Sequence, residues 1–193
     1  FGQEILGPIL LDFMQENPKV EVELDFDSVH VDIISEKYDL VVRMGELNDS
    51  NFVGRHLINY ETKVCASPEY LQKYGNLNHP SQLKDHNVIM GSVKNWRFES
   101  LDKNQKSIVD VFVKGKFVSQ NGYIARLAAI NGHGIVRLPQ YYLEEPLKSG
   151  VLVNAIDGWS LNQSKVSLVY PLSRHKSKKV QALIDFIVQK FRN

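Results

Sequence analysis

The sequence predicts an α/β fold with helices packed on a parallel sheet, and three observations support this fold class. Apolar residues recur at helical spacing across residues 5–14. Apolar and charged residues then alternate across residues 20–26, which is typical of a half-buried strand. The run 40–42 is apolar on both faces, as in a strand inside a parallel sheet. A short helix is expected at residues 28–37, between these two strands. The order strand, helix, strand indicates β-α-β connectivity.

The start of the first helix has two interpretations. Gly7-Pro8 fits a helix start, because a proline at the first helical position gives up no hydrogen bond. The alternative is a longer helix from Phe1 with an interior proline. Asn17-Pro18 ends the helix in either case, because the residue before a proline disfavours helical geometry.

Helices and strands continue to alternate through the rest of the chain. The expected strands span residues 53–58, 61–66, 88–90, 96–98, 108–113, 116–118, 135–136, 151–153 and 166–170. The expected helices start near Ser67, Ser81, Asn121, Tyr141 and Ser177. Ser67 and Asn121 stand where helix caps stand, since their side chains can accept backbone N–H bonds. The last helix carries one apolar stripe, which predicts packing on a core along its whole length.

Composition bounds the class of protein. The chain has 193 residues, of which 43% are hydrophobic and 23% charged, as in one soluble domain or two small ones. No apolar run is long enough to span a membrane, and no secretory signal is visible after Phe1. A net charge of +1 falls short of the basic footprint of a stand-alone nucleic-acid binder. The lone cysteine, Cys65, excludes an internal disulfide and favours a reducing, cytoplasmic compartment.

The sequence carries no motif for catalysis or for a resident cofactor. The G-x-S-x-G elbow, the P-loop, the G-x-G-x-x-G turn and the H-E-x-x-H metal motif are all missing. The six histidines are scattered, so we expect no metal site and no catalytic residue. His86 and His133 stand at helix ends, where a structural role is favoured over proton transfer. Cys65 lies in an apolar strand, which favours a small buried side chain over a reactive thiol.

Arg43 directly follows the apolar run 40–42, at the end of an expected strand. In open α/β sheets, ligands bind beyond the carboxyl ends of the strands. A guanidinium at that position could bind a carboxylate or a phosphate. An ordinary ion pair with Asp39 or Glu46 is the alternative, and this stretch taken alone favours it.

Several short motifs follow one another in a fixed order over nearly the whole chain. They are Pro8-x-x-x-x-Phe13, Asn17-Pro18, Asp39-Leu-Val-Val-Arg-Met-Gly45, Leu47-x-Asp49-Ser50, Ala66-Ser-Pro-Glu-Tyr-Leu71, Trp96, Asn131-Gly-His-Gly-Ile-Val-Arg-Leu-Pro139, Gly150-Val-Leu-Val153 and Val169-Tyr-Pro171. Each motif is weak alone, but together they resemble the effector-binding domain of LysR-type transcriptional regulators. The resemblance is closest to the CrgA and AphB-like group.

The resemblance implies an α/β periplasmic-binding-protein type II fold. Two α/β subdomains would be joined by two crossover strands, with a small-molecule cleft between them. One subdomain would hold residues 1–66 and 168–193, and the other residues 67–167. The strands at 61–66 and 166–170 would form the hinge. In this family, the region that the chain resembles is preceded by a winged helix-turn-helix, a linker helix and the first strand of the domain. We expect these three elements to be absent from this chain.

The resemblance also implies a binding site and a dimer. The residues expected to contact a small, anionic effector are Phe1, Gly2, Arg43, Gly45, Ser67, Ser92, Trp96, Asn121, His133 and Ile135. Arg137 could point either way from its strand. The family's antiparallel dimer would pair Ile5, Ile9 and Phe13 of one subunit with Ile124 and Leu127 of its partner. The full-length protein would be a tetramer that contacts DNA only through the absent N-terminal domain, with no membrane partner.

Two other classes stay open. A solute-binding protein of a transport system shares this fold, but it is exported and monomeric. A regulator without a ligand, which responds to pH or redox state through a histidine or Cys65, is a weaker alternative.

Overall fold

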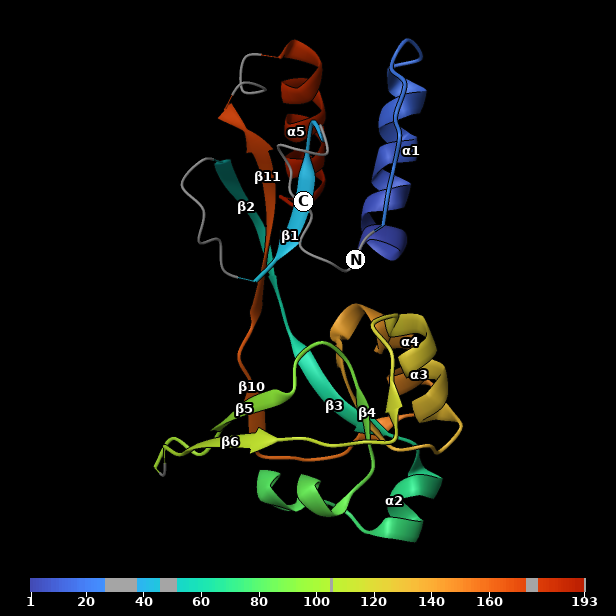
Figure 1. Ribbon diagram of the computed structural model, residues 1–193, viewed down its shortest axis with the longest axis vertical. Coiled ribbons are helices and arrows are strands. Elements are labelled where there is room, and N and C mark those ends of the chain that lie inside the picture. The colour runs from blue at the N-terminus through green and yellow to red at the C-terminus, as the bar shows by residue number, and fades with distance from the viewer. Residues whose placement is uncertain (27–37, 46–51, 105, 173–176, 193) are drawn as a thin grey trace. The chain divides into compact units, whose positions relative to one another are not determined.

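The computed structural model divides the chain into two compact units (Figure 1). Unit 1 holds residues 1–59 and 164–193, and unit 2 holds residues 60–163. The structure describes residues 1–26, 38–45, 52–104, 106–172 and 177–192. The helix expected at residues 28–37 lies outside these ranges. The subdomain boundaries expected after residues 66 and 167 stay a prediction.

One continuous helix opens unit 1, and it begins earlier than Gly7. Its first turns, η1 (Gly2–Leu6), are π-helical and lead directly into α1 (Gly7–Glu16). Pro8 has no N–H to donate, and in a regular α-helix its ring crowds the carbonyl four residues earlier. A wider π-turn, in which the Gly7 N–H donates to the Gly2 carbonyl, leaves room for the ring. The longer helix with an interior proline is therefore the correct interpretation.

The sheet of unit 1 has three strands in the order β1-β11-β2. β1 (Val41–Met44) pairs antiparallel with β11 (Ser164–Pro171), and β2 (Phe52–Tyr60) lies on the other side of β11. The parallel pairing expected around residues 40–42 is therefore wrong.

The strand expected at residues 20–26 is also wrong, because the structure has no strand there. Alternation suits a pleated surface, but a strand forms only where a neighbouring strand completes its hydrogen bonds. Among the described residues, this segment pairs with no other strand. Its last two apolar side chains, Leu24 and Phe26, are accordingly exposed.

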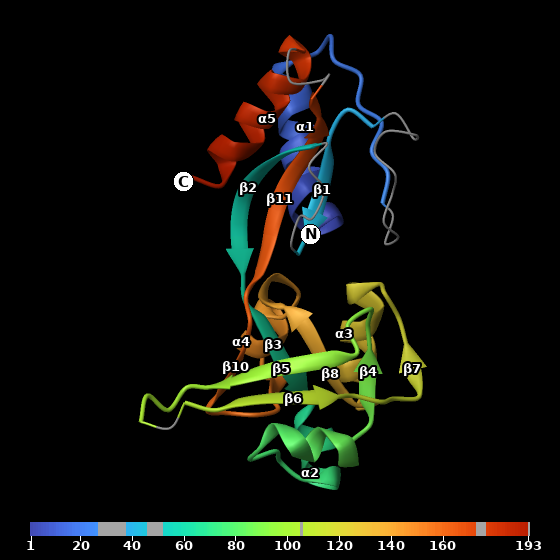
Figure 2. The ribbon, with the colours of Figure 1, turned by 60° about the vertical axis from the view of Figure 1, so that its left-hand side comes forward.

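Helices α1 and α5 pack on each other beside the unit 1 sheet (Figure 2). Helix α5 (Lys178–Lys190) buries Val180, Ile184, Ile187 and Val188, which confirms the predicted apolar stripe. Phe13 of α1 packs edge-on against Phe186 of α5, with ring centroids 5.3 Å apart. An ion pair of 2.8 Å between Lys190 and Asp12 also joins the two helices.

Unit 2 is built on a five-stranded sheet with the order β7-β4-β8-β3-β9. Its strands are β3 (Thr62–Ala66), β4 (Val88–Met90), β7 (Phe117–Val118), β8 (Ile135–Pro139) and β9 (Val153–Asn154). Strand β4 runs parallel to both β7 and β8, whereas β3 runs antiparallel to β8 and β9. Parallel pairing, as the sequence predicted for the chain, is thus found in unit 2.

Both faces of this sheet are covered. One face packs on α3 (Gly122–Ile130) and on the segment around α4 (Glu144–Lys148), with Cys65 and Val136 between the layers. The other face packs on α2 (Pro68–Tyr74), on the 3₁₀ turn η2 (Pro80–Asp85) and on a second sheet. Unit 2 therefore has a buried core on each side of its main sheet.

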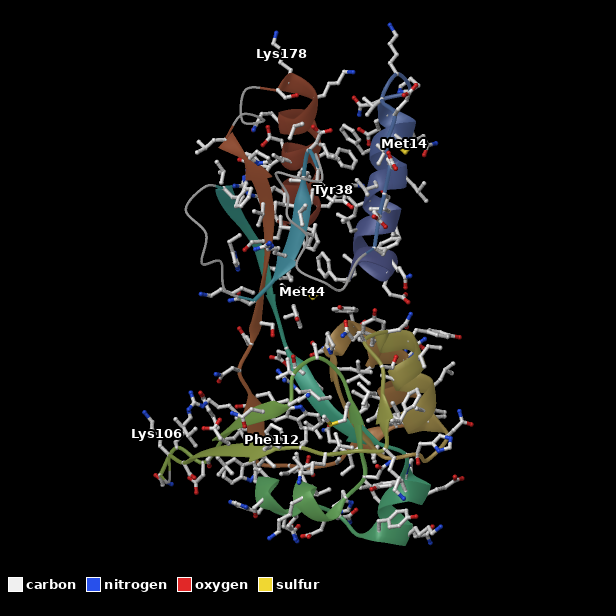
Figure 3. The ribbon with its side chains drawn as sticks, in the orientation of Figure 1. Met14, Tyr38, Met44, Lys106, Phe112 and Lys178 are labelled. Atoms are coloured by element: carbon white, nitrogen blue, oxygen red, sulfur yellow. The ribbon has the colours of Figure 1, made fainter. Side chains whose placement is uncertain are left out.

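The second sheet of unit 2 has the order β10-β5-β6 and is antiparallel. Its strands are β5 (Asn95–Ser100), β6 (Ile108–Phe112) and β10 (Trp159–Leu161). Trp96 and Phe98 of β5 point into the core, whereas Ile108 and Phe112 of the edge strand β6 are exposed (Phe112 is labelled in Figure 3). In the part of the chain that is described, no helix is long and apolar enough to cross a membrane.

Candidate functional site

The parallel strands of unit 2 end at one edge of the sheet, which we call the carboxyl edge. Ser92 follows β4 there, Asn121 follows β7, and Arg137 lies in the middle of β8. β3 begins at the same edge, because Thr62 is paired with Pro139. Ligands of α/β sheets bind beyond the carboxyl ends of parallel strands, so this edge is the candidate site in unit 2.

Asn121 and Ser92 both present polar groups at the carboxyl edge. The Oδ1 atom of Asn121 accepts the N–H groups of Tyr123 at 3.0 Å and Ile124 at 3.2 Å, so the predicted cap of α3 is confirmed. Ser92 is exposed in the bend after β4. These two predicted site residues therefore lie at one edge of the sheet, on neighbouring strand ends.

Three other predicted site residues lie toward the opposite edge, where the parallel strands begin. Ser67 is buried and caps α2 by accepting the Tyr70 N–H at 3.2 Å. His133 is exposed, and its carbonyl accepts a hydrogen bond from the Asn87 side chain. Ile135 is fully buried at the start of β8. The structure does not bring these residues together with Ser92 and Asn121.

Trp96 is a core residue of unit 2. Only 2% of its surface is exposed, and its indole N–H donates to the Val93 carbonyl at 3.1 Å. Its ring lies 6.5 Å from that of Phe98, in the core between the two sheets. Trp96 thus packs in the core through its ring and uses its indole N–H for a hydrogen bond within unit 2.

Unit 1 holds the remaining predicted site residues. Arg43 is half-buried in β1, paired with Ser167 of β11. Gly45 has a φ of 98°, which only glycine adopts readily, and its N–H donates to the Lys165 carbonyl at 2.9 Å. Glu46, one of the ion-pair partners considered for Arg43, lies outside the described residues.

Phe1 and Gly2 are packing residues of unit 1. Phe1 is buried, and its ring stacks on Phe191 with centroids 5.8 Å apart. Gly2 lies under the Phe26 ring, so closely that an added Cβ would stand 2.7 Å from that ring. A side chain at position 2 would therefore have to displace the Phe26 ring, so packing rather than backbone geometry favours glycine here.

The helices named for a dimer differ in how much apolar surface they expose. Phe13 is buried against Phe186, and Ile5 of η1 and Ile9 of α1 are half-buried. On α3, Ile124 and Leu127 are exposed one helical turn apart. Helix α3 therefore presents the apolar surface to solvent, while Phe13 belongs to the interior of unit 1.

Cys65 is a buried structural residue. It is fully enclosed in β3, and burial raises the pKa of its thiol to about 12, which outweighs the opposing effect of Lys63. The reactive thiolate is accordingly scarce at neutral pH. Burial also lowers the pKa of His86, against the opposing effect of Asp85. Within the described ranges, no group of three or more His, Cys, Asp or Glu side chains could hold a metal ion.

Arg137 is the residue whose direction the sequence left open. Its neighbours Val136 and Leu138 both pack on the α3 side of the sheet, so Arg137 points to the other side. The alternation was visible in the sequence, but which face each set occupies depends on the packing of α3.

The sequence and the structure are both similar to those of known proteins. The family model described as the LysR substrate binding domain matches residues 1–192. An uncharacterized HTH-type transcriptional regulator of Haemophilus influenzae is 30% identical over 188 residues, which are 95% of this chain and 64% of that protein. The full-length structure of the Vibrio cholerae virulence activator AphB has a TM-score of 0.86 at 25% identity, over 98% of this chain and 65% of AphB. The structure of the CrgA regulatory domain from Neisseria meningitidis has a TM-score of 0.81 at 26% identity, over 98% of this chain and 93% of that chain.

The CrgA structure is a regulatory domain, and the AphB structure is a full-length regulator that includes one. Regulatory domains of this family have the type II periplasmic-binding-like fold, and the chain has the same α/β class of fold. The chain belongs to the LysR substrate binding domain family. It is therefore an effector-binding domain of the kind found in LysR-type regulators. The resemblance and the fold class stated from the motifs are thereby confirmed. The chain spans 64% of the Haemophilus relative and 65% of AphB.

Proposed function

We propose that this domain binds a small anionic effector, and that this binding controls transcription by a full-length DNA-binding regulator. The observation that carries the proposal is the carboxyl edge of unit 2, where polar side chains follow parallel strands in a domain of the LysR family. A ligand shifts a protein between two states only through its different affinity for them. We therefore expect the effector to favour one state of the domain and to pass that preference to the DNA-binding part.

We propose Arg43, Gly45, Ser92 and Asn121 as the residues that contact the effector. We do not place the other six predicted residues in the site, and they are Phe1, Gly2, Ser67, Trp96, His133 and Ile135. Phe1, Ser67, Trp96 and Ile135 are buried, and Gly2 lies under the Phe26 ring. His133 is exposed but lies toward the edge of the sheet away from Ser92 and Asn121.

Replacing Arg43 by alanine is expected to weaken the binding of a small carboxylate by about tenfold or more, because a hydrogen bond to a charged group contributes roughly 1.5–3 kcal/mol. Isothermal titration with a panel of carboxylates measures the change. Arg97→Ala is the matched control, since Arg97 is an exposed arginine that pairs with Asp110 at 3.0 Å on the second sheet of unit 2. Equal heats for wild type and Arg43→Ala would remove Arg43 from the site.

We also propose a homodimer in which Ile5 and Ile9 of one subunit contact Ile124 and Leu127 of its partner. The exposed pair on α3 and the half-buried pair on the continuous η1–α1 helix are apolar and spaced for one helix face each. Burying such side chains at an interface removes apolar surface from water. Phe13, which is enclosed within unit 1, holds α1 in place rather than contacting the partner.

Ile124→Glu is expected to convert the dimer to a monomer, because it places a charge in the apolar interface. Light scattering coupled to size exclusion measures the mass. Val151→Glu is the matched control, since Val151 is 44% exposed and Ile124 is 42% exposed. A wild-type protein that is monomeric at micromolar concentration contradicts the dimer, and equal dissociation of both variants contradicts the α3 surface.

For the whole protein we propose a cytoplasmic tetramer that binds DNA through an N-terminal winged helix-turn-helix. The relatives reported above are described as transcriptional regulators, which favours this class over a solute-binding protein of a transport system. The buried thiol of Cys65 argues against redox sensing at that residue. A promoter-binding assay of the full-length protein, with and without the effector, tests the regulatory role.

A further inference from the structure

Arg137 carries a buried nitrogen that has no hydrogen-bond partner. Its Nε atom is excluded from solvent, and within the described part of the chain it meets no acceptor. A guanidinium stays protonated at physiological pH, so this nitrogen is always a donor. The Arg137 side chain as a whole is half-buried, and an unpaired buried donor on a charged group is unfavourable in the folded state. Proteins retain such groups mainly where a ligand, an ion or a water completes the bonding.

Strand β8 places this side chain among apolar groups. Because Val136 and Leu138 face α3, Arg137 faces the other core, where its partner in β3 is Val64. Met90, at the end of the neighbouring strand β4, is buried in that same core. Burial lowers the pKa of the guanidinium, although it stays charged at neutral pH.

Two tyrosine rings meet close to the guanidinium. Tyr60 lies close enough to Arg137 to raise the pKa of the guanidinium, against the larger lowering effect of burial. The Tyr60 ring packs edge-on against Tyr141, with centroids 6.0 Å apart. Tyr141 belongs to the 3₁₀ turn η3 (Gln140–Tyr142), whose Gln140 N–H donates to the Glu61 carbonyl at 2.9 Å. All these residues belong to unit 2, and they lie where β8 ends and β3 begins.

We propose that Arg137 binds the carboxylate of a small organic acid whose flat, apolar part contacts the Tyr60 and Tyr141 rings. One guanidinium balances one negative charge, so a carboxylate leaves less uncompensated charge at this position than a phosphate dianion. The apolar surroundings favour an organic acid over a hydrated inorganic anion. The inference rests on the proposed effector function, and it adds the chemical class of the effector and a residue that anchors it.

Benzoate is the probe, and the readout is the Nε–Hε signal of Arg137 in a ¹⁵N NMR spectrum of the 193-residue chain. The signal is assigned by its absence from the Arg137→Met variant. Benzoate should shift it until the site saturates. Benzyl alcohol, which lacks the charge, and sodium chloride, which lacks the ring, should leave it in place. A signal that ignores benzoate, or that follows chloride equally, overturns the proposal.

Variants separate binding from folding. Arg137→Met should raise the Kd for benzoate by about tenfold or more, and Arg137→Lys should recover only part of the affinity because it lacks the planar fork. Arg97→Met is the matched control and should bind like wild type, since Arg97 is already paired with Asp110. Without ligand, Arg137→Met should unfold at a higher urea concentration than wild type, because the buried, unpaired Nε–H donor is gone. A lower midpoint with unchanged benzoate affinity would assign Arg137 a structural role instead.

Failure of this inference can be told apart from failure of the effector function. If a neutral metabolite alters promoter binding by the full-length protein while benzoate leaves Arg137 unmoved, the effector function stands and the carboxylate anchor fails. If benzoate binds at Arg137 but no carboxylate alters promoter binding, the anchor stands and the regulatory role fails.

Discussion

Trp96→Ala is expected to lower the free energy of unfolding by about 3–5 kcal/mol, because it empties the centre of a core. The indole is almost fully enclosed between the two sheets of unit 2 and packs on Phe98. Its loss also leaves the Val93 carbonyl without the hydrogen bond that it now accepts. Urea unfolding followed by circular dichroism measures the difference.

Trp96→Phe is the companion variant, since it keeps most of the ring while removing the N–H. We expect it to lose only about 1–2 kcal/mol, roughly one hydrogen bond with a small cavity. The sequence placed Trp96 in the effector site, and the two interpretations give different results. If Trp96→Ala folds as stably as wild type but fails to bind the effector, the indole is a ligand contact and its core role is wrong.

Gly134→Ala is expected to destabilise the fold by about 3 kcal/mol, since backbone strain and overpacking each contribute roughly 1–3 kcal/mol. Gly134 has a φ of 155°, and an added Cβ would collide with the backbone carbonyl of Asn87. That carbonyl cannot easily move away, because it accepts the Ile135 N–H at 2.9 Å. The Asn87 side chain is fixed as well, by its bond to the His133 carbonyl.

Gly150→Ala separates strain from collision. Gly150 has a φ of 77°, but an added Cβ there would meet no atom within 4 Å. We therefore expect a loss of only about 1 kcal/mol, the usual effect of a left-handed backbone on a residue with a side chain. Thermal unfolding of both variants provides the comparison. Equal losses at the two positions would mean that the contact with Asn87 has no influence.

Local patterns in the sequence predicted helices better than strands. The stripe on α5 and the caps at Ser67 and Asn121 depend on residues within one or two turns, so the sequence contains all that is needed. Residues 20–26 have the alternation of a strand but no partner among the described residues, and pairing is not a local property. The first helix shows the same limit on a smaller scale, since the π-turn before Pro8 arises from a steric conflict rather than from a periodic pattern.

For the candidate site, the sequence indicated residue types at strand ends but not which edge or face they occupy. Ser92 and Asn121 follow parallel strands and reach the carboxyl edge, whereas His133 precedes β8 and lies toward the other edge. This distinction needs the strand order, which motifs do not contain. Arg137 was the opposite case, because its residue type suggested a ligand but its direction could be assigned only from the packing of Val136.

The enclosure of the single thiol has a practical consequence for spectroscopy. A maleimide dye added to the native chain should leave Cys65 untouched, so cysteines introduced at exposed positions can be labelled without first replacing it. Gln72 on α2 and Gln189 on α5 are exposed, and they belong to different units. Fluorophores attached there would report the distance between the units in solution, with and without an effector, in an otherwise unaltered sequence.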